Sequence, residues 1–161
     1  MVGEGGLPGG DPVAVVRQFG EQVPHSRDLG MQVLAMEDDQ VRMRLVPQPW
    51  LLDDDDTAEL CSSVLYSLAD SAAGLAVYAA TRTLTPIATL DLRMDYLRPA
   101  AGDRAVVALA RCLRFTEDVA LVHCEIRSEG QTQPVATGTV NFMRNTQGRR
   151  FQAADEGDQR A

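Results

Sequence analysis

Asp70 is the residue of this chain most suited to do chemistry. It is the only charged residue between Leu60 and Thr81. A buried charge is costly unless it is paired or hydrogen-bonded, so a lone carboxylate in an uncharged stretch indicates a specific role. Such a carboxylate can act as a general base toward water or as a nucleophile; the alternative is a structural carboxylate bonded to nearby N–H or hydroxyl groups.

Three further residues near Asp70 carry reactive or polar groups. Cys61 stands near the start of the predicted helix, and a helix N-terminus can activate a thiol. No histidine lies near it in sequence, so a small core residue is the simpler interpretation. Ser63 and Ser67 either present hydroxyl groups to a ligand or allow close packing of the helix.

The two histidines and the acidic run are weaker candidates for catalytic or metal-binding residues. His25 is expected in a loop, and His123 alternates with apolar neighbours on the solvent side of a strand. The run Asp53 to Asp56 supplies carboxylates without the spacing of a calcium loop. We therefore expect no metal site and no cofactor.

One long helix is expected to position these groups. Apolar residues recur at helical spacing and predict a helix from about Thr57 to Thr81, buried almost all round. Steps of three and four from Asp70 put Ser63, Ser67 and Gly74 on the same face. Asp56 followed by Glu59 matches a capping box, which predicts where the helix begins.

Two strands are expected before this helix in sequence and four after it, and a short helix over 13–19 and a loop over 22–30 precede them all. The predicted strands are 31–36, 40–46, 87–97, 104–113, 119–127 and 134–143. The longest alternates, with Ala88, Leu90, Leu92, Met94 and Tyr96 on one face and Thr89, Asp91, Arg93 and Asp95 on the other. The order of elements predicts an α+β domain in which a curved antiparallel sheet wraps one helix.

Composition bounds the class of protein. The 161 residues fit a single domain over 11–144, with disordered segments over 1–10 and 145–161. A net charge of -8 argues against a nucleic-acid partner. Three cysteines without paired spacing favour a reducing cytoplasm, and the polar residues of the long helix argue against a membrane partner.

Two segments resemble a known family. The stretches SVLYSLADSAAGLA and TLDLRMDYLRPAAGD are similar to the hotdog-fold acyl-CoA thioesterases of the phenylacetate-pathway type, and the resemblance covers roughly residues 22 to 143. It implies an α+β hotdog fold of about six strands and an acyl-CoA or related thioester as substrate. It also implies a homodimer or a dimer of dimers, in which strand 87–97 pairs across the two-fold axis.

The family motif suggests roles for individual residues. Its pattern is NxxGxxHGG, six residues and then a catalytic Asp or Glu, for which Asp70 is the counterpart here. Asp55 then falls on the Asn, Ala58 on the Gly, Cys61 on the His, and Ser62 and Ser63 on the two glycines. The resemblance implies that backbone N–H groups at the helix start polarise the thioester carbonyl, that Thr89 orients a water molecule, and that Arg98 meets CoA phosphates. Substrate-binding positions would be Asp55, Cys61, Ser62, Ser63, Ser67 and Arg98.

The replaced motif leaves two functions open. One is hydrolysis of an acyl-CoA with Asp70 as base or nucleophile. The other is a module that binds an acyl-thioester with little or no turnover, because Cys61-Ser62-Ser63 stands in place of His-Gly-Gly. A hydratase would need an Asp and a His a few residues apart, which neither His25 nor His123 provides.

Overall fold

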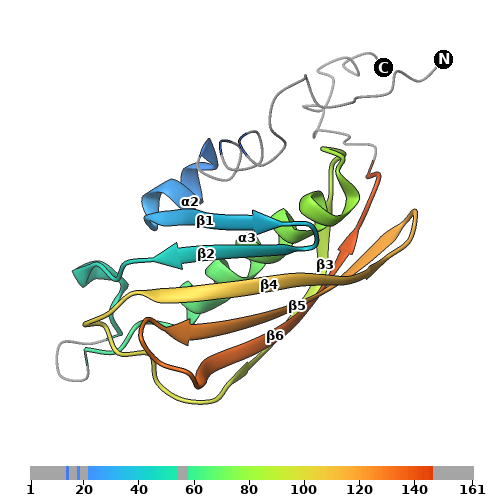
Figure 1. Ribbon diagram of the computed structural model, residues 1–161. Coiled ribbons are helices and arrows are strands. Elements are labelled where there is room, and N and C mark those ends of the chain that lie inside the picture. The colour runs from blue at the N-terminus through green and yellow to red at the C-terminus, as the bar shows by residue number, and fades with distance from the viewer. Residues whose placement is uncertain (1–13, 15–17, 19–21, 54–57, 147–161) are drawn as a thin grey trace, which may run out of the picture.

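The computed structural model describes residues 14, 18, 22–53 and 58–146, and its elements are arranged around one long helix (Figure 1). The helices are α2 (Pro24–Asp28), the 3-10 helix η1 (Pro49–Leu51) and α3 (Ser62–Thr81). The strands are β1 (Met31–Glu37), β2 (Gln40–Leu45), β3 (Ala88–Tyr96), β4 (Val106–Phe115), β5 (Val119–Ser128) and β6 (Pro134–Met143).

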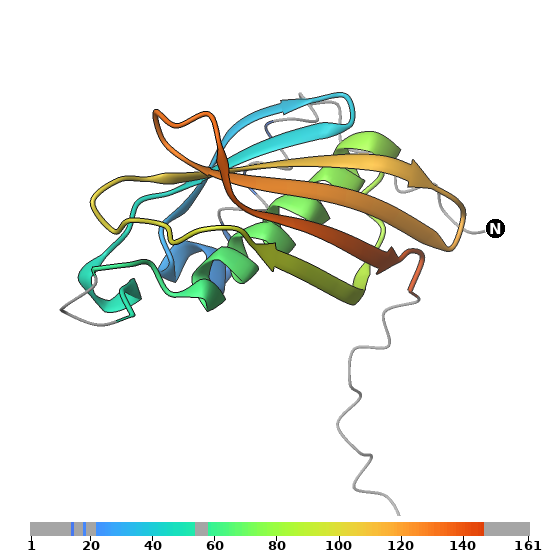
Figure 2. The ribbon, with the colours of Figure 1, turned by 90° about the horizontal axis from the view of Figure 1, so that it is seen from below.

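The six strands form one sheet in the order β1-β2-β4-β5-β6-β3, and neighbouring strands are antiparallel. The sheet curves around α3, which lies on its concave side (Figure 2). Strands β1 and β3 are the two edges, so they flank the helix on opposite sides. The α+β hotdog architecture that the sequence predicts is confirmed.

The core lies between α3 and the sheet. Leu68, Ala72 and Val77 of the helix are fully buried, as are Val122 and Val140 of the sheet. Many of the buried helix residues are alanine, which lets the helix approach the strands closely while the larger side chains fill the gaps. By length and composition alone α3 is apolar enough to cross a membrane, but half of that window is buried inside the fold.

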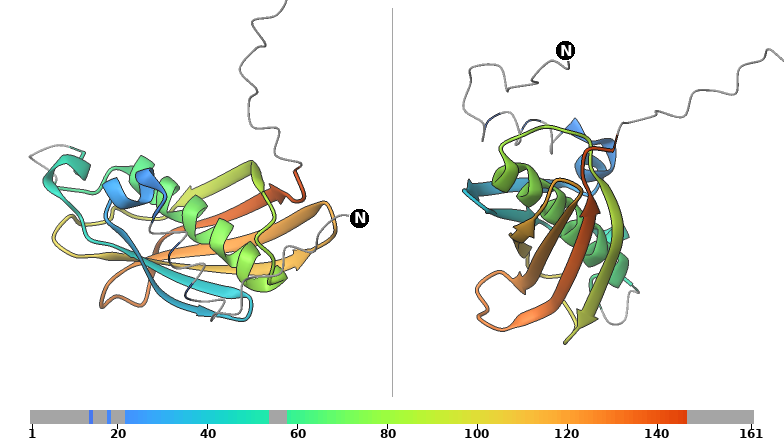
Figure 3. Two further views of the ribbon diagram at one scale, coloured as in Figure 1. Left: turned by 90° about the horizontal axis from the view of Figure 1, so that it is seen from above. Right: turned by 90° about the vertical axis from the view of Figure 1, so that its right-hand side faces the viewer.

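One face of α3 is not covered by the sheet, which corrects the expectation of a helix buried almost all round. Ser63 and Tyr66 are exposed, and Ser67, Asp70 and Gly74 are half-buried. These residues follow helical spacing, so they form a single stripe. The stripe contacts α2 through His25 and Ser67 and β3 through Thr89 and Asp70, and Figure 3 shows the arrangement of α2, α3 and β3. The face that carries Asp70 is therefore open in a single chain.

The helix begins later than its predicted capping box. Its N-cap is Cys61, whose side chain makes no capping hydrogen bond, and Ser62 is the first helical residue. Glu59 forms a β-bridge with Ala101, and Leu60 donates its N–H to the Ala100 carbonyl at 2.8 Å. These contacts hold the chain extended up to Leu60, so Glu59 is not in the first turn; Asp56 and Thr57 lie outside the described residues.

Other boundaries differ in smaller ways. The expected loop 22–30 contains the helix α2, which begins with a proline at its first turn. β4 runs two residues beyond its predicted end because a bulge between Cys112 and Arg114 absorbs the break in alternation. Residues 1–10, nearly all of the expected helix over 13–19 and residues 147–161 lie outside the described residues, so those expectations stay predictions.

Candidate active site

Asp70 meets Thr89 across the gap between the central helix and the edge strand. Thr89 Oγ1 donates a hydrogen bond to Asp70 Oδ1 at 2.9 Å. Asp70 is half-buried on the open face of α3, and Thr89 is exposed on β3. A hydrogen bond to an ionised carboxylate is stronger than a neutral one, so this contact fixes the orientation of the carboxylate while leaving it accessible to a ligand.

A β-bulge brings Thr89 to this face. Thr89 pairs with Phe142 and Asp91 with Asn141, so Leu90 has no partner in the register. Phe142 is buried against the helix and is directly opposite Thr89, which puts both on the inner face. The strict alternation predicted for this strand is therefore wrong at its start, where Leu90 is half exposed and Thr89 points inward.

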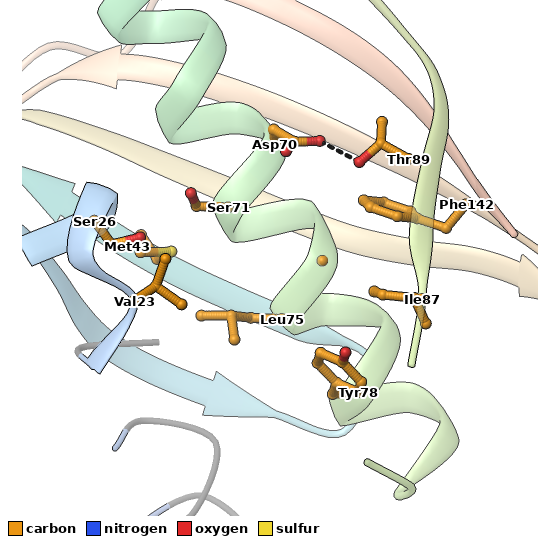
Figure 4. Close-up of a pocket in the computed structure, with 11 residues that line it drawn as sticks. Val23, Ser26, Met43, Asp70, Ser71, Leu75, Tyr78, Ile87, Thr89 and Phe142 are labelled. Carbon is orange, nitrogen blue, oxygen red and sulfur yellow. Dashed lines mark hydrogen bonds between the residues drawn. The ribbon is translucent and has the colours of Figure 1, made fainter. Parts of the chain in front are cut away.

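A pocket of about 270 Å³ continues from Asp70 along the helix (Figure 4). Asp70 and Thr89 are at one end and Tyr78 is toward the other, with Ile87 and Phe142 on one side of α3 and Val23 and Met43 on the opposite side. The full lining is Val23, Ser26, Met43, Asp70, Ser71, Gly74, Leu75, Tyr78, Ile87, Thr89 and Phe142. The arrangement is a polar end joined to a mostly apolar trough, which suits a reacting group attached to a hydrocarbon chain.

A second pocket of about 320 Å³ lies at the start of α3. Ser62 and Arg98 both line it, together with the carboxylate residues Asp53 and Glu59. The Tyr96 hydroxyl donates to the Ser62 carbonyl at 3.2 Å, which ties the end of β3 to the first turn of the helix. The first backbone N–H groups of a helix have no intrahelical partner, so this end of α3 offers donors to an oxygen atom.

The two groups of site residues are separated within one chain. Asp70 follows Ser62 by eight positions, which at 1.5 Å per residue is about 12 Å along the helix axis. Asp70 and Thr89 share the first pocket, while Ser62 and Arg98 share the second. A single carbonyl carbon cannot contact both groups in one subunit.

The sequence-based reasoning missed a contact made by α2. His25 Nε2 lies 3.2 Å from Ser67 Oγ, on the helix face of Asp70 but one turn earlier. Nothing in the local pattern around His25 signals this contact, because the two residues are 42 positions apart. His123, in contrast, is exposed on β5 as predicted.

The cysteines differ in exposure. Burial raises the pKa of Cys124 to about 12 and also raises the pKa of Cys112, so both thiols stay protonated near neutral pH. Cys61 is half-buried at the N-cap of α3. Ser63 is exposed in the first turn, and Asp55 lies outside the described residues.

Candidate metal ligands are dispersed in the described part of the chain. There, no three residues of the types His, Cys, Asp and Glu are grouped so that they could hold a metal ion.

Comparison with known proteins relates this geometry to a family. The model of the family described as "Thioesterase superfamily" matches residues 62–135. YigI of Escherichia coli K12, named a medium/long-chain acyl-CoA thioesterase, is 30% identical over 142 residues, covering 80% of this chain and 90% of YigI.

Solved structures agree with this comparison. A Pseudomonas aeruginosa protein superposes with a TM-score of 0.75 at 25% identity, covering 83% of this chain and 99% of that one. A mutant of the phenylacetic acid degradation protein PaaI from Thermus thermophilus superposes with a TM-score of 0.66 at 30% identity, covering 75% of this chain and 98% of that one.

Proposed function

This chain belongs to the thioesterase superfamily, and from that membership we propose that it hydrolyses acyl-CoA thioesters with Asp70 as the reacting carboxylate. One observation carries the assignment to Asp70. The only charged side chain of the central helix is half-buried at the polar end of the pocket and is held there by Thr89. A carboxylate so placed has a fixed direction and an adjoining space for a substrate.

The chemistry requires a proton acceptor or a nucleophile next to the thioester carbonyl. Thr89 holds Oδ1, so Oδ2 is directed to accept a proton from water as that water attacks the carbonyl carbon. The C–S bond then breaks, the acyl group leaves as a carboxylic acid, and the thiolate of CoA takes up the proton. In the alternative course Oδ2 attacks the carbonyl carbon and the C–S bond breaks, so that the CoA thiolate leaves and a mixed anhydride forms. Water then hydrolyses the anhydride, which regenerates the Asp70 carboxylate and releases the carboxylic acid, and the remaining proton goes to the thiolate.

The oxygen of the thioester needs hydrogen-bond donors as negative charge develops on it. The backbone N–H groups of Ser62 and Ser63 are suited to this role, because the helix dipole also favours negative charge there. They lie about 10 to 12 Å along the axis from Asp70 of the same chain. We therefore assign them to the site of a second subunit, in which the helix start of one chain meets Asp70 of the other.

The remaining contacts would bind the two ends of the substrate. Arg98 is exposed beside the helix start, and its guanidinium suits a CoA phosphate. We also assign substrate contacts to Cys61, the N-cap residue next to Ser62, to Ser67, which is one turn before Asp70 on the same helix face, and to Asp55, which precedes the helix in sequence. The apolar trough beyond Asp70 suits an aliphatic acyl chain, in keeping with the medium and long chains in the name of YigI.

The test is an acyl-CoA hydrolysis assay over chains of increasing length, with the release of free thiol as the readout. Asp70→Asn should lower kcat by at least about 100-fold, because general-base catalysis contributes that much or more. Its melting temperature should stay near the wild-type value, since the Asn carbonyl can still accept the Thr89 hydrogen bond.

Asp91→Asn is the matched control. Asp91 is on the same strand as Thr89 but on the outer face, where Asn141 Nδ2 donates to its carboxylate at 3.0 and 3.1 Å. This variant should keep wild-type hydrolysis. Equal activity of Asp70→Asn and the wild type would contradict the assignment of Asp70.

Binding without turnover is the second candidate function. It is favoured by Cys61-Ser62-Ser63, the three residues that the resemblance aligns with the His-Gly-Gly of the family motif. Each added Cβ narrows the space above the backbone donors. Calorimetric binding of an acyl-CoA by a wild-type protein that hydrolyses none would establish this function instead.

A further inference from the structure

Gly74 is a glycine that neither the backbone nor the packing of α3 requires. Glycine in a helix interior is less favourable than alanine. The glycines with positive φ in the described residues are Gly30 and Gly130, so Gly74 has no such backbone need. A methyl group added at Gly74 would lie 3.7 Å from Ile87 Cδ1 and 3.8 Å from Phe142 Cε1, which is ordinary van der Waals contact.

Two other glycines show what a packing requirement looks like. A methyl group at Gly102 would lie 2.7 Å from the Ala58 carbonyl oxygen, a backbone atom that cannot move aside, so this position needs glycine. One at Gly138 would lie 2.6 Å from Met94 Sδ and 3.0 Å from the Arg93 carbonyl oxygen, so this position is also crowded. Alanine would fit at Gly74 and would favour the helix. We therefore look for a functional reason why this position has no side chain.

The space that the missing methyl group leaves belongs to the pocket. Gly74 lines the trough one turn after Asp70 and one turn before Tyr78, so all three share a helix face. At 1.5 Å per residue, Gly74 is about 6 Å and Tyr78 about 12 Å along the axis from Asp70. Bare backbone thus forms the floor of the trough at its midpoint, facing Ile87 and Phe142.

We propose that Gly74 determines which acyl chains this enzyme accepts, by leaving room on the helix for the middle of an unbranched chain of medium length. This inference rests on the proposed function, in which the thioester carbonyl lies at Asp70. An extended chain advances somewhat less than its carbon–carbon bond length of about 1.5 Å per carbon, so roughly five carbons reach Gly74 and roughly ten reach Tyr78. Butyryl chains end before Gly74, whereas decanoyl chains cross it.

The experiment compares butyryl-CoA with decanoyl-CoA in Gly74→Ala. The added methyl group should raise KM for decanoyl-CoA about tenfold, equivalent to losing the burial of roughly two methylene groups. Butyryl-CoA should be hydrolysed as by the wild type, and kcat should not change for either substrate. The melting temperature should rise because alanine favours the helix, so a loss of folding cannot account for the lower activity.

Ala80→Gly is the control for helix stability. Ala80 is half-buried on the same helix but lines a different pocket, near Arg82 and Cys112. It should lower the melting temperature and leave the ratio of decanoyl-CoA to butyryl-CoA hydrolysis unchanged. Gly74→Val, which adds a larger side chain, should shift the preference further toward butyryl-CoA.

The outcomes separate this inference from the proposed function. If the wild type hydrolyses acyl-CoA and Gly74→Ala affects both substrates equally or neither, the role of Gly74 is overturned and the proposed function stands. If the wild type hydrolyses none, the proposed function is overturned, and calorimetry with decanoyl-CoA then decides the inference. Tenfold weaker binding of decanoyl-CoA to Gly74→Ala would support it, while unchanged or undetectable binding to both proteins would overturn it.

Discussion

At the scale of single residues, the site depends on a pair that brings together the helix and the edge strand. Asp70 is a charge that the surrounding sequence makes conspicuous, but its orientation comes from Thr89, which is 19 positions later. The contact joins a half-buried carboxylate to an exposed hydroxyl group. We assign Thr89 the role of positioning the carboxylate.

Thr89→Ala and Thr89→Ser test this role. A hydrogen bond to a charged group contributes about 1.5 to 3 kcal/mol, so Thr89→Ala should lower kcat/KM by roughly 10- to 100-fold. Thr89→Ser keeps the hydroxyl group and should restore most of the activity. Steady-state kinetics with one acyl-CoA is the measurement, and equal losses in both variants would show that the hydroxyl group has no part in the reaction.

At the scale of elements, the edge strand β3 is connected to the central helix α3 by side-chain hydrogen bonds. It is joined to α3 by the Thr89–Asp70 contact, by the Tyr66 hydroxyl donating to the Leu92 carbonyl at 3.3 Å, and by the Tyr96 contact with Ser62. The bulge leaves Leu90 unpaired, so the residues before it face the opposite way from what regular alternation along the strand would give. Thr89 therefore faces the site because Leu90 is left out of the pairing, whereas regular pairing of Leu90 would turn Thr89 outward.

A pair of deletions examines the bulge. Removing Leu90 should leave Thr89 inward and Asp91 outward in regular alternation, so this variant should keep most of its hydrolytic activity. Removing Arg93, which pairs regularly with Thr139, should turn Leu92 outward and lose both thermal stability and activity. Circular dichroism and the thiol-release assay give the two readouts, and an inactive but folded Leu90 deletion would contradict this account of the strand.

At the scale of the whole molecule, three features point to a second copy of the chain. β3 is an edge strand whose residues are exposed or half-buried, the face of α3 beside it is open, and the two groups of site residues lie on separate parts of that face. An edge strand presents unpaired backbone groups that another strand can pair with. We propose that β3 pairs with β3 of a second subunit and that this brings each Asp70 to the helix start of its partner.

Light scattering tests whether the chain associates. It should give a mass that is a multiple of 17.5 kDa and not 17.5 kDa itself.

Mixing two inactive variants tests whether the site is shared between subunits. Ser63→Pro removes one backbone donor from the first turn, where proline is tolerated, and should be inactive, as should Asp70→Asn. Unfolding and refolding the two together should recover roughly a quarter of wild-type activity, because half of the dimers would be mixed and each would hold one intact site. No recovery from mixed dimers would show that both groups act within one chain.

The sequence by itself determined the elements and singled out Asp70. Helical spacing in α3 and alternation in β5 and β6 come from residues close together in the chain, so their existence and most of their bounds were predictable. The resemblance of two segments to thioesterases added the family, which the comparisons confirm. The charge of Asp70 stood out because every neighbour in its helix lacks one.

Only the tertiary structure decided how these parts meet. The bulge at Leu90 depends on the pairing of β3 with β6, which is about 50 positions away, and the late start of α3 depends on bridges to Ala100 and Ala101. The open face of α3, the contact between His25 and Ser67 and the trough over Gly74 likewise arise between segments distant in sequence. Spacing along a chain records which face a residue occupies within its own element, but register, bulges and pockets are set by packing between elements, which local periodicity does not encode.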